Sequence, residues 1–328
     1  MMLLRHLRFA LIICAVALVF ACTKNEWPRV PVGNGSECIY VLGDIQYYTV
    51  SNENMQYYKR TLDWIHKYSG TKICCVMQTG DVSEQNKPGQ WKNFFDATVE
   101  FGRNHIFVAC TGNHDYDWDD EQHIQDRKTT KLSQYALFDK LKENIVAWYE
   151  YGSLENVVVR NAVRGRRLDI ISLEFGPRTE VLDWALNYVV SNPDTDFILL
   201  THEWLSTEGK RISSNAYSTA QLRNTTTSTP QQIWEKLVYK NDNIRCVVCG
   251  HNGFCAQFYT PNETGRDVPQ CLFNLQYKPF GGDGLIQQWE FPENTSRTIV
   301  RIIDTKNSLN YYESGVATTF VLDSLQRI

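Results

Sequence analysis

Short apolar segments alternate with longer amphipathic ones in the first part of the chain. Segments 38–44, 72–81 and 105–115 are apolar over strand length and end in polar residues. Between them, segments 52–70 and 89–102 place apolar residues at helical spacing. The order strand, helix, strand, helix, strand is typical of parallel strands covered by helices. The sequence therefore predicts an α/β fold.

The same alternation continues to the C-terminus, without an internal repeat or a composition break. Further helices are expected at 131–145, 178–192 and 230–240, further strands at 155–163, 166–176, 195–204, 243–253, 270–277, 284–291 and 297–304, and polar surface loops at 116–132 and 213–229. We therefore expect one domain over residues 37–328.

Composition and charge are those of an ordinary globular protein. The 328 residues are 43% hydrophobic and 21% charged, with a net charge of -4 and a pI near 6.0. No long basic run could follow a phosphate backbone. An obligatory nucleic-acid partner is therefore excluded on electrostatic grounds.

The N-terminus has the pattern of an export signal. Arg5 and Arg8 precede an apolar run over 9–21, and Cys22 opens a polar stretch. The run is short for a membrane-spanning helix and typical of a signal peptide. The letters LVFAC resemble a bacterial lipobox, and the alternative is a plain signal peptide with a chance cysteine. We expect a lipoprotein-type signal peptide at 1–21, a linker at 22–36, and an exported chain anchored in the cell envelope by lipid on Cys22.

Eight cysteines lie outside the signal region. Cys246 and Cys249 form a C-x-x-C pattern, but they lie in an apolar strand segment rather than at a strand-to-helix turn. We therefore expect them in the core and not in a redox centre. An exported chain could form disulfides, but their pairing does not follow from the sequence.

Five predicted strands end in side chains that can bind metals. In chain order these are Asp44 and Gln46, Asp81, Asn113 with His114 and Asp115, His202, and His251. The carboxyl ends of parallel strands converge on the ligand site of an α/β sheet. Carboxylate and amide oxygens together with imidazole nitrogens suit a divalent transition metal, whereas calcium and magnesium prefer oxygen alone. The sequence therefore predicts a metal site at the strand ends.

The order of these motifs resembles that of the calcineurin-like metallophosphoesterase family. The family pattern is Asp-x-His, Gly-Asp, Gly-Asn-His-Asp/Glu, a strand-end His and Gly-His-x-His; this chain has GDIQ, GD, GNHD, His202 and GHNG between Gly43 and Gly253. The opening GDIQYY and the later FNLQYKPFGGDGLIQQWEF also look like a bacterial exported subgroup. The resemblance implies a four-layer α/β/β/α sandwich with the metal site at one end of the sheets.

The resemblance also implies a role for each residue. Asp81 would bridge two metals and Asp44 would bind the first. Asn113, His202 and His251 would bind the second. His114 would face the phosphate as electrostatic stabiliser or general acid, oriented by Asp115.

The chain departs from the family pattern at Gln46 and Gly253, where the family has histidines that serve the first metal. Three outcomes are open: a metal held weakly by Asp44, Asp81, the Gln46 amide oxygen and water; a ligand recruited from Asn252, Asn274 or Gln276; or no metal. We expect divalent ions (Mn, Fe, Zn or Mg), one firmly bound and a second bound more weakly.

These features predict a hydrolase of phosphoester bonds. The substrate would be a phosphorylated small molecule, a nucleotide or a glycan, as a monoester or a diester, and metal-activated hydroxide would attack phosphorus with His114 assisting. The alternative is a noncatalytic, lipid-anchored binding protein that keeps one structural metal. A mononuclear hydrolase of non-phosphate esters is a further alternative.

Overall fold

The computed structural model describes residues 35–312 except 224, 294 and 296, together with the backbone of residues 319–321. The predicted signal peptide, Cys22 and most of the linker lie outside the described residues. In the described part of the chain, no helix is both long enough and apolar enough to cross a membrane.

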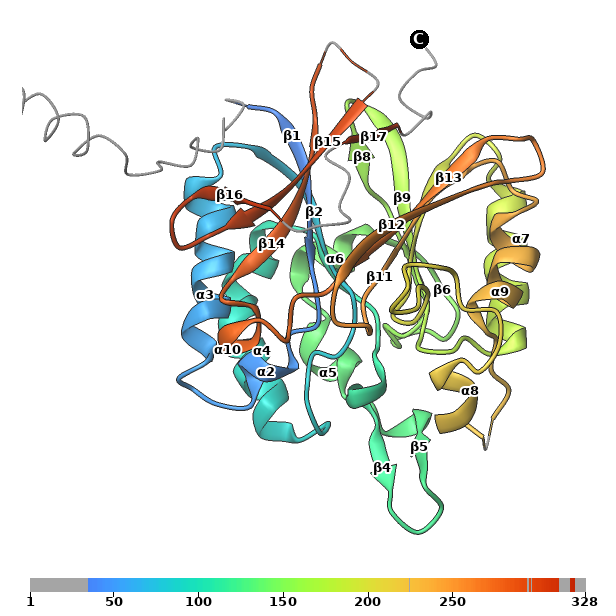
Figure 1. Cartoon of the computed structure of the whole chain (residues 1–328), viewed down its shortest axis with the longest axis horizontal. Coiled ribbons are helices and arrows are strands. Elements are labelled where there is room, and N and C mark those ends of the chain that lie inside the picture. The colour runs from blue at the N-terminus through green and yellow to red at the C-terminus, as the bar shows by residue number, and fades with distance from the viewer. Residues whose placement is uncertain (1–34, 224, 294, 296, 313–318, 322–328) are drawn as a thin grey trace, which may run out of the picture.

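Two mixed β-sheets form the centre of the molecule (Figure 1). The first has the strand order β16-β15-β14-β1-β2-β3, with β17 beside β15. Its strands are β1 (Glu37–Leu42), β2 (Lys72–Gln78), β3 (Phe107–Ala109), β14 (Leu285–Phe291), β15 (Arg297–Asp304), β16 (Leu309–Tyr311) and β17 (Thr319–Val321). Strands β1, β2 and β3 are parallel, so their carboxyl ends share one edge of the sheet.

The second sheet has the order β12-β13-β11-β10-β9-β7-β6, with β8 beside β9. Its strands are β6 (Ile145–Trp148), β7 (Val157–Val159), β8 (Ala162–Val163), β9 (Arg166–Ser172), β10 (Asp196–Leu200), β11 (Ile244–Cys249), β12 (Cys255–Pro261) and β13 (Asp267–Phe273). Strands β9, β10, β11 and β13 are parallel.

Helices cover the outer faces of both sheets (Figure 1). On the first sheet lie α3 (Met55–Asp63), extended by the π-helical turn η1 (Trp64–Tyr68), and α4 (Pro88–Asn104). On the second lie α7 (Thr179–Ser191) and α9 (Pro230–Ile233), extended by the π-helical turn η4 (Trp234–Val238). The shorter helices are α2 (Gln46–Thr49), α5 (Leu132–Ala136), α6 (Asp139–Asn144), α8 (Tyr217–Gln221) and α10 (Pro279–Gly282). The predicted α/β class with its α/β/β/α layers is confirmed.

The alternation of side chains along β10 explains how the second sheet packs on both faces. Ile198 and Leu200 belong to the core cluster that includes the first sheet, whereas Phe197 and Leu199 belong to the cluster under α7 and η4. Successive side chains of a strand point to opposite faces, so a strand buried on both faces is apolar at every position. Cys246 and Cys249 are likewise fully buried, which confirms that they are core residues. No disulfide joins any of the eight cysteines that the structure describes.

The structure differs from the sequence prediction in local detail. The expected loop 116–132 contains a hairpin of β4 (Asp117–Asp119) and β5 (Ile124–Asp126), followed by the 3-10 turn η3 (Arg127–Thr129). The expected loop 213–229 contains α8. Neither the hairpin nor α8 has a long apolar periodicity in the sequence. Each depends on contacts with the rest of the domain, so the sequence pattern alone did not predict it. The strand expected at 105–115 is β3 alone, since the residues after it turn into the site as η2 (Asn113–Asp115).

The packing of β10 gives the first test. Replacement of buried Ile198 by alanine should lower the free energy of unfolding by about 2–5 kcal/mol, because it leaves a cavity between the sheets. Urea denaturation measures the change. Val190→Ala on the exposed side of α7 is the control and should change stability by no more than about 0.5 kcal/mol. Equal effects of the two substitutions would contradict the described packing.

Candidate metal centre

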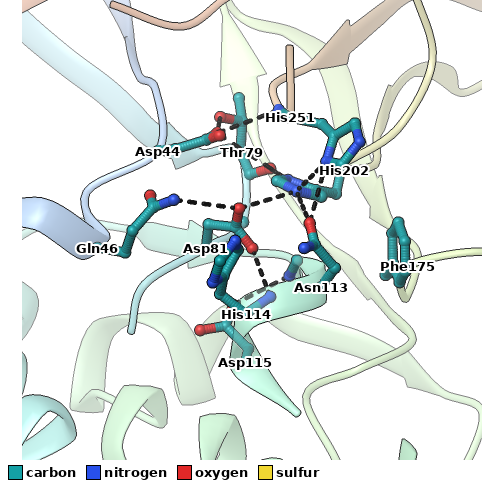
Figure 2. Close-up of polar contacts among 12 residues, drawn as sticks. Asp44, Gln46, Thr79, Asp81, Asn113, His114, Asp115, Phe175, His202 and His251 are labelled. Carbon is teal, nitrogen blue, oxygen red and sulfur yellow. Dashed lines mark hydrogen bonds and ion pairs between the residues drawn. The ribbon is translucent and has the colours of Figure 1, made fainter. Parts of the chain in front are cut away.

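The structure brings together residues that follow five strands of the two sheets. Asp44 follows β1, Asp81 follows β2 and Asn113 follows β3, all in the first sheet. His202 follows β10 and His251 follows β11 in the second sheet. Figure 2 shows their side chains pointing toward one another, although the sequence separates the first from the last by more than 200 positions.

Four electron-pair donors from these residues lie close together. His202 Nε2 is 3.3 Å from Asp81 Oδ2, 3.1 Å from Asn113 Oδ1 and 3.2 Å from His251 Nδ1. His251 Nδ1 is 3.0 Å from Asn113 Oδ1. Ligand atoms about 2.0–2.2 Å from one zinc-like ion stand about this far from each other. The donor set and its spacing therefore fit one divalent ion, and we call these four residues the metal cluster.

Hydrogen bonding and charge prepare both histidine rings for a cation. His202 Nδ1 donates to the Thr79 carbonyl oxygen at 2.7 Å, so its Nε2 is the nitrogen that faces the cluster. Burial lowers the pKa of His202, but the carboxylates of Asp81 and Asp44 outweigh burial and raise it to about 10. Burial and the neighbouring His202 lower the pKa of His251 to about 3, so this ring is neutral. The buried carboxylates thus favour a positive charge at the cluster, and a divalent metal ion is one group that would supply it.

The backbone at two of these residues is held in a costly conformation. Asp81 has φ 52° and His251 has φ 68°, both in the left-handed region that residues other than glycine rarely adopt. Each such residue costs about 1–3 kcal/mol and persists only where the surrounding structure enforces it. Gly112 is part of that surrounding structure, because a Cβ atom there would overlap the Asp81 carboxylate.

Asp44 and Gln46 lie beside the metal cluster rather than within it. The Asp44 carboxylate accepts hydrogen bonds from Thr79 Oγ1 at 3.3 Å, the His251 backbone N–H at 3.2 Å and Asn274 Nδ2 at 2.5 Å. Gln46 Nε2 donates to Asp81 Oδ2 at 3.4 Å. Both side chains are almost fully buried.

His114 lies at the open side of the site, with 38% of its side chain exposed. Its backbone N–H donates to Asp81 Oδ1 at 2.9 Å, and its ring Nδ1 donates to the Glu84 carbonyl oxygen at 2.8 Å. Burial lowers the pKa of His114, but Asp81 and Glu84 outweigh burial and raise it above its ordinary value. The remaining nitrogen, Nε2, is the one available to a substrate.

Asp115 does not orient the His114 ring, and that part of the expectation is wrong. Its buried carboxylate accepts from the backbone N–H groups of Gly112, Val82 and Ser83 and from Ser83 Oγ. These bonds join the turn after β2 to the turn after β3. Glu84 is the ring's partner instead, and sequence reasoning missed it, although it stands only three residues after Asp81.

Other residues of the site carry no motif. Gln125, from the hairpin, donates to the Asn113 carbonyl oxygen, and Thr79 supports both His202 and Asp44. The ring of Tyr217 lies 5.1 Å from that of His251, centroid to centroid. These residues share only their position next to a strand end or in a polar loop. Many other residues have such positions, so the sequence could not identify these as site residues.

The chain belongs to the calcineurin-like phosphoesterase family, whose model matches residues 39–253, about two thirds of the chain. This match confirms the predicted family and places the chain among hydrolases of phosphoester bonds. All eight predicted site residues fall within the matched range. No curated protein sequence is significantly similar to this chain.

Several solved structures are similar to it at low identity. A 5'-nucleotidase precursor from Thermus thermophilus is 12% identical, with a TM-score of 0.42 and coverage of 88% of this chain and 54% of that one. A 5'-nucleotidase from Candida albicans is 11% identical, with a TM-score of 0.47 and coverage of 85% and 53%. A protein from Streptococcus pneumoniae described as a predicted phosphoesterase is 11% identical, with a TM-score of 0.34 and coverage of 88% and 98%. The chain spans about half the length of the two nucleotidases.

The bonds of Asp115 give a test of its role. Asp115→Ala should lower the free energy of unfolding by about 3 kcal/mol or more, because it leaves several buried donors without a partner. Asp115→Asn should keep the Nδ1–H tautomer of His114, measured by nitrogen-15 NMR, because the ring is held by Glu84. Asp120→Ala, at an exposed position of the hairpin turn, is the control for stability. A change of tautomer in Asp115→Asn without loss of stability would restore the orienting role.

Proposed function

We propose that this chain is a metal-dependent phosphoester hydrolase of the bacterial cell envelope. The observation that carries the proposal is the metal cluster, in which Asp81, Asn113, His202 and His251 direct four electron-pair donors at one point. Its donor set, its spacing and its need for positive charge all suit a divalent ion such as Mn, Fe or Zn. The family supplies the reaction class.

A divalent ion bound there would supply positive charge to a phosphate oxygen and would lower the pKa of water. Among the chain's own groups, His114 is placed to transfer a proton through Nε2. Its raised pKa means that more of the ring is protonated near neutral pH than for an ordinary histidine. The attacking water would release one proton to solvent, its oxygen would bond to phosphorus as the bond from phosphorus to the leaving oxygen breaks, and His114 would give the leaving oxygen a proton.

The substrate and the location stay predictions. The proposed metal ion and His114 would contact only the phosphate of a substrate. A phosphorylated small molecule, a nucleotide or a glycan would therefore each suit the site. Export rests on the Arg5 and Arg8 pair and the apolar run that follows it, and lipid anchoring rests on Cys22. Membership of a bacterial exported subgroup rests on the GDIQYY opening and the later FNLQYKPFGGDGLIQQWEF alone.

The rival function is a noncatalytic binding protein with one structural metal. The replacement of both first-metal histidines, at Gln46 and Gly253, favours it. Against it stands His114, whose ring makes no described contact with the four cluster atoms and whose side chain is 38% exposed at the site. A structural metal would not need such a residue.

Activity and metal content together test the proposal. The chain without residues 1–22, loaded with manganese, zinc or iron, should hydrolyse p-nitrophenyl phosphate or its bis ester. Asp81→Ala and His251→Ala should lose both bound metal and turnover. His114→Asn should keep the metal and lose about a hundredfold or more in kcat, as expected for a missing proton donor.

The matched control is His66→Asn, which removes an exposed histidine before the amino end of β2, at the opposite end of the sheet from the site. It should change neither metal content nor turnover. Stoichiometric metal without turnover on a broad panel of phosphoesters would favour the binding protein.

A further inference from the structure

Protein groups fill the position beside the metal cluster where the family pattern has its first metal. The family histidines at that position correspond to Gln46 and Gly253. Asp44, Asn274, Gln46 and Tyr277 surround this position, and their role here rests on the proposed metal-dependent function.

Asp44, which would be a first-metal ligand, is already satisfied by three hydrogen-bond donors. Thr79 Oγ1 and the His251 backbone N–H donate to Oδ1, and Asn274 Nδ2 donates to Oδ2 at 2.5 Å. These donors occupy most of the about four lone-pair sites of the carboxylate and leave one on Oδ2. The short bond from Asn274 is the one that would compete most directly with an incoming ion.

Asn274 is fixed with its NH2 group toward Asp44. Its Oδ1 accepts from the Gln276 backbone N–H at 3.1 Å, and its Nδ2 also reaches the His251 carbonyl oxygen at 3.3 Å. Turning the carboxamide would lose all these bonds and place two oxygens against each other. Asn274 therefore acts as a donor to Asp44 and not as a metal ligand.

The other candidate ligands differ in how far their side chains are engaged. Gln46 presents Nε2, not its oxygen, to Asp81 Oδ2. Asn252 donates to the Leu205 carbonyl oxygen at 2.6 Å. Gln276 and Asp44 line a small cavity of about 20 Å³, large enough for one water molecule. The Oε1 atoms of Gln46 and Gln276 are buried without a hydrogen-bond partner among the described groups, and a water molecule in this cavity would be a suitable partner for that of Gln276.

Tyr277 takes the room of the missing histidine. A Cβ atom on Gly253 would overlap the Tyr277 ring at Cδ2 and Cε2. Gly253 does not have a positive φ, so the backbone itself would accept a side chain. A glycine at position 253 therefore leaves room for the Tyr277 ring and is not required by the backbone conformation. Tyr47 packs edge-on against Tyr277 at 6.2 Å between ring centroids, and Gly281 lies against Tyr47.

We propose that this chain binds a single metal ion, and that the amide groups of Asn274 and Gln46 replace the first ion as partners of Asp44 and Asp81. Tyr277, although 68% exposed, fills the space that a side chain on Gly253 would need. Asn274 and Tyr277 lie beyond residues 39–253, so both come from outside the range that matches the family.

The single-metal centre has a chemical consequence. Neutral NH2 groups balance the carboxylates by hydrogen bonding, but they cannot acidify water as a cation does. An ion held by the metal cluster would therefore be the cation that acidifies water, and His114, with 38% of its side chain exposed, would be available for proton transfer.

Metal counting tests this directly. The chain without residues 1–22, which retains the whole described fold, is saturated with Mn2+ and analysed by native mass spectrometry and by electron paramagnetic resonance. We expect one ion per chain and the six-line spectrum of isolated Mn2+. Two ions with the exchange-coupled spectrum of a manganese pair would overturn the inference. No bound ion would overturn the proposed function itself.

Reconstruction of the family pattern tests the role of Tyr277. Gln46→His with Gly253→His should still bind one ion, because the new histidine has no room. Adding Tyr277→Ala and Asn274→Ala should allow a second ion to bind. In a matched control, Tyr68→Ala, at an exposed tyrosine of η1, replaces Tyr277→Ala. This control variant should not bind a second ion. Binding of a second ion by the double variant alone would show that Tyr277 does not exclude it.

Discussion

Four electron-pair donors, two from each sheet, converge at the carboxyl ends of the strands, and the remainder of the site is arranged to hold them there. Asp81 and Asn113 come from the first sheet, and His202 and His251 from the second. Burial keeps the donors away from solvent, so their charge has to be balanced locally. The need for a local positive charge is seen in the raised pKa of His202, whereas burial and His202 lower the pKa of His251. A metal ion is the group that satisfies both rings at once.

The turns that position these donors adopt unfavourable backbone conformations. Asp81 and His251 adopt left-handed backbone conformations, and Gly112 is needed so that the turn after β3 can approach Asp81. The Asp115 carboxylate ties the two turns together through their backbone N–H groups. Residues of the GNHD motif thus differ in their contacts, although they are adjacent in sequence: Asn113 faces the cluster, the His114 ring bonds to Glu84, and Asp115 bonds to backbone groups.

In the single-metal proposal, hydrogen bonds take the place of a second cation beside the metal cluster. Hydrogen bonds to a charged acceptor are stronger than those between neutral groups. Asn274 and Gln46 donate such bonds to Asp44 and Asp81, and a Cβ atom on Gly253 would overlap the ring of Tyr277. Neutral side chains would then occupy the position that the family pattern gives to a metal.

The α/β class and the order of the main strands and helices follow from the sequence, because apolar periodicity is a local property of the chain. The order of the strand-end motifs, through the family resemblance, also pointed to Asp81, Asn113, His202 and His251 as candidate metal ligands. It also marked Gln46 and Gly253 as the two departures from the family. Only the tertiary structure decided what replaces the missing histidines, since Asn274 and Tyr277 reach the site from a segment far along the chain. The same holds for Glu84, which contacts His114 through its backbone carbonyl, and for Asp115, whose partners are mostly backbone groups. Contacts of this kind depend on how turns approach one another in space, and no residue pattern records them.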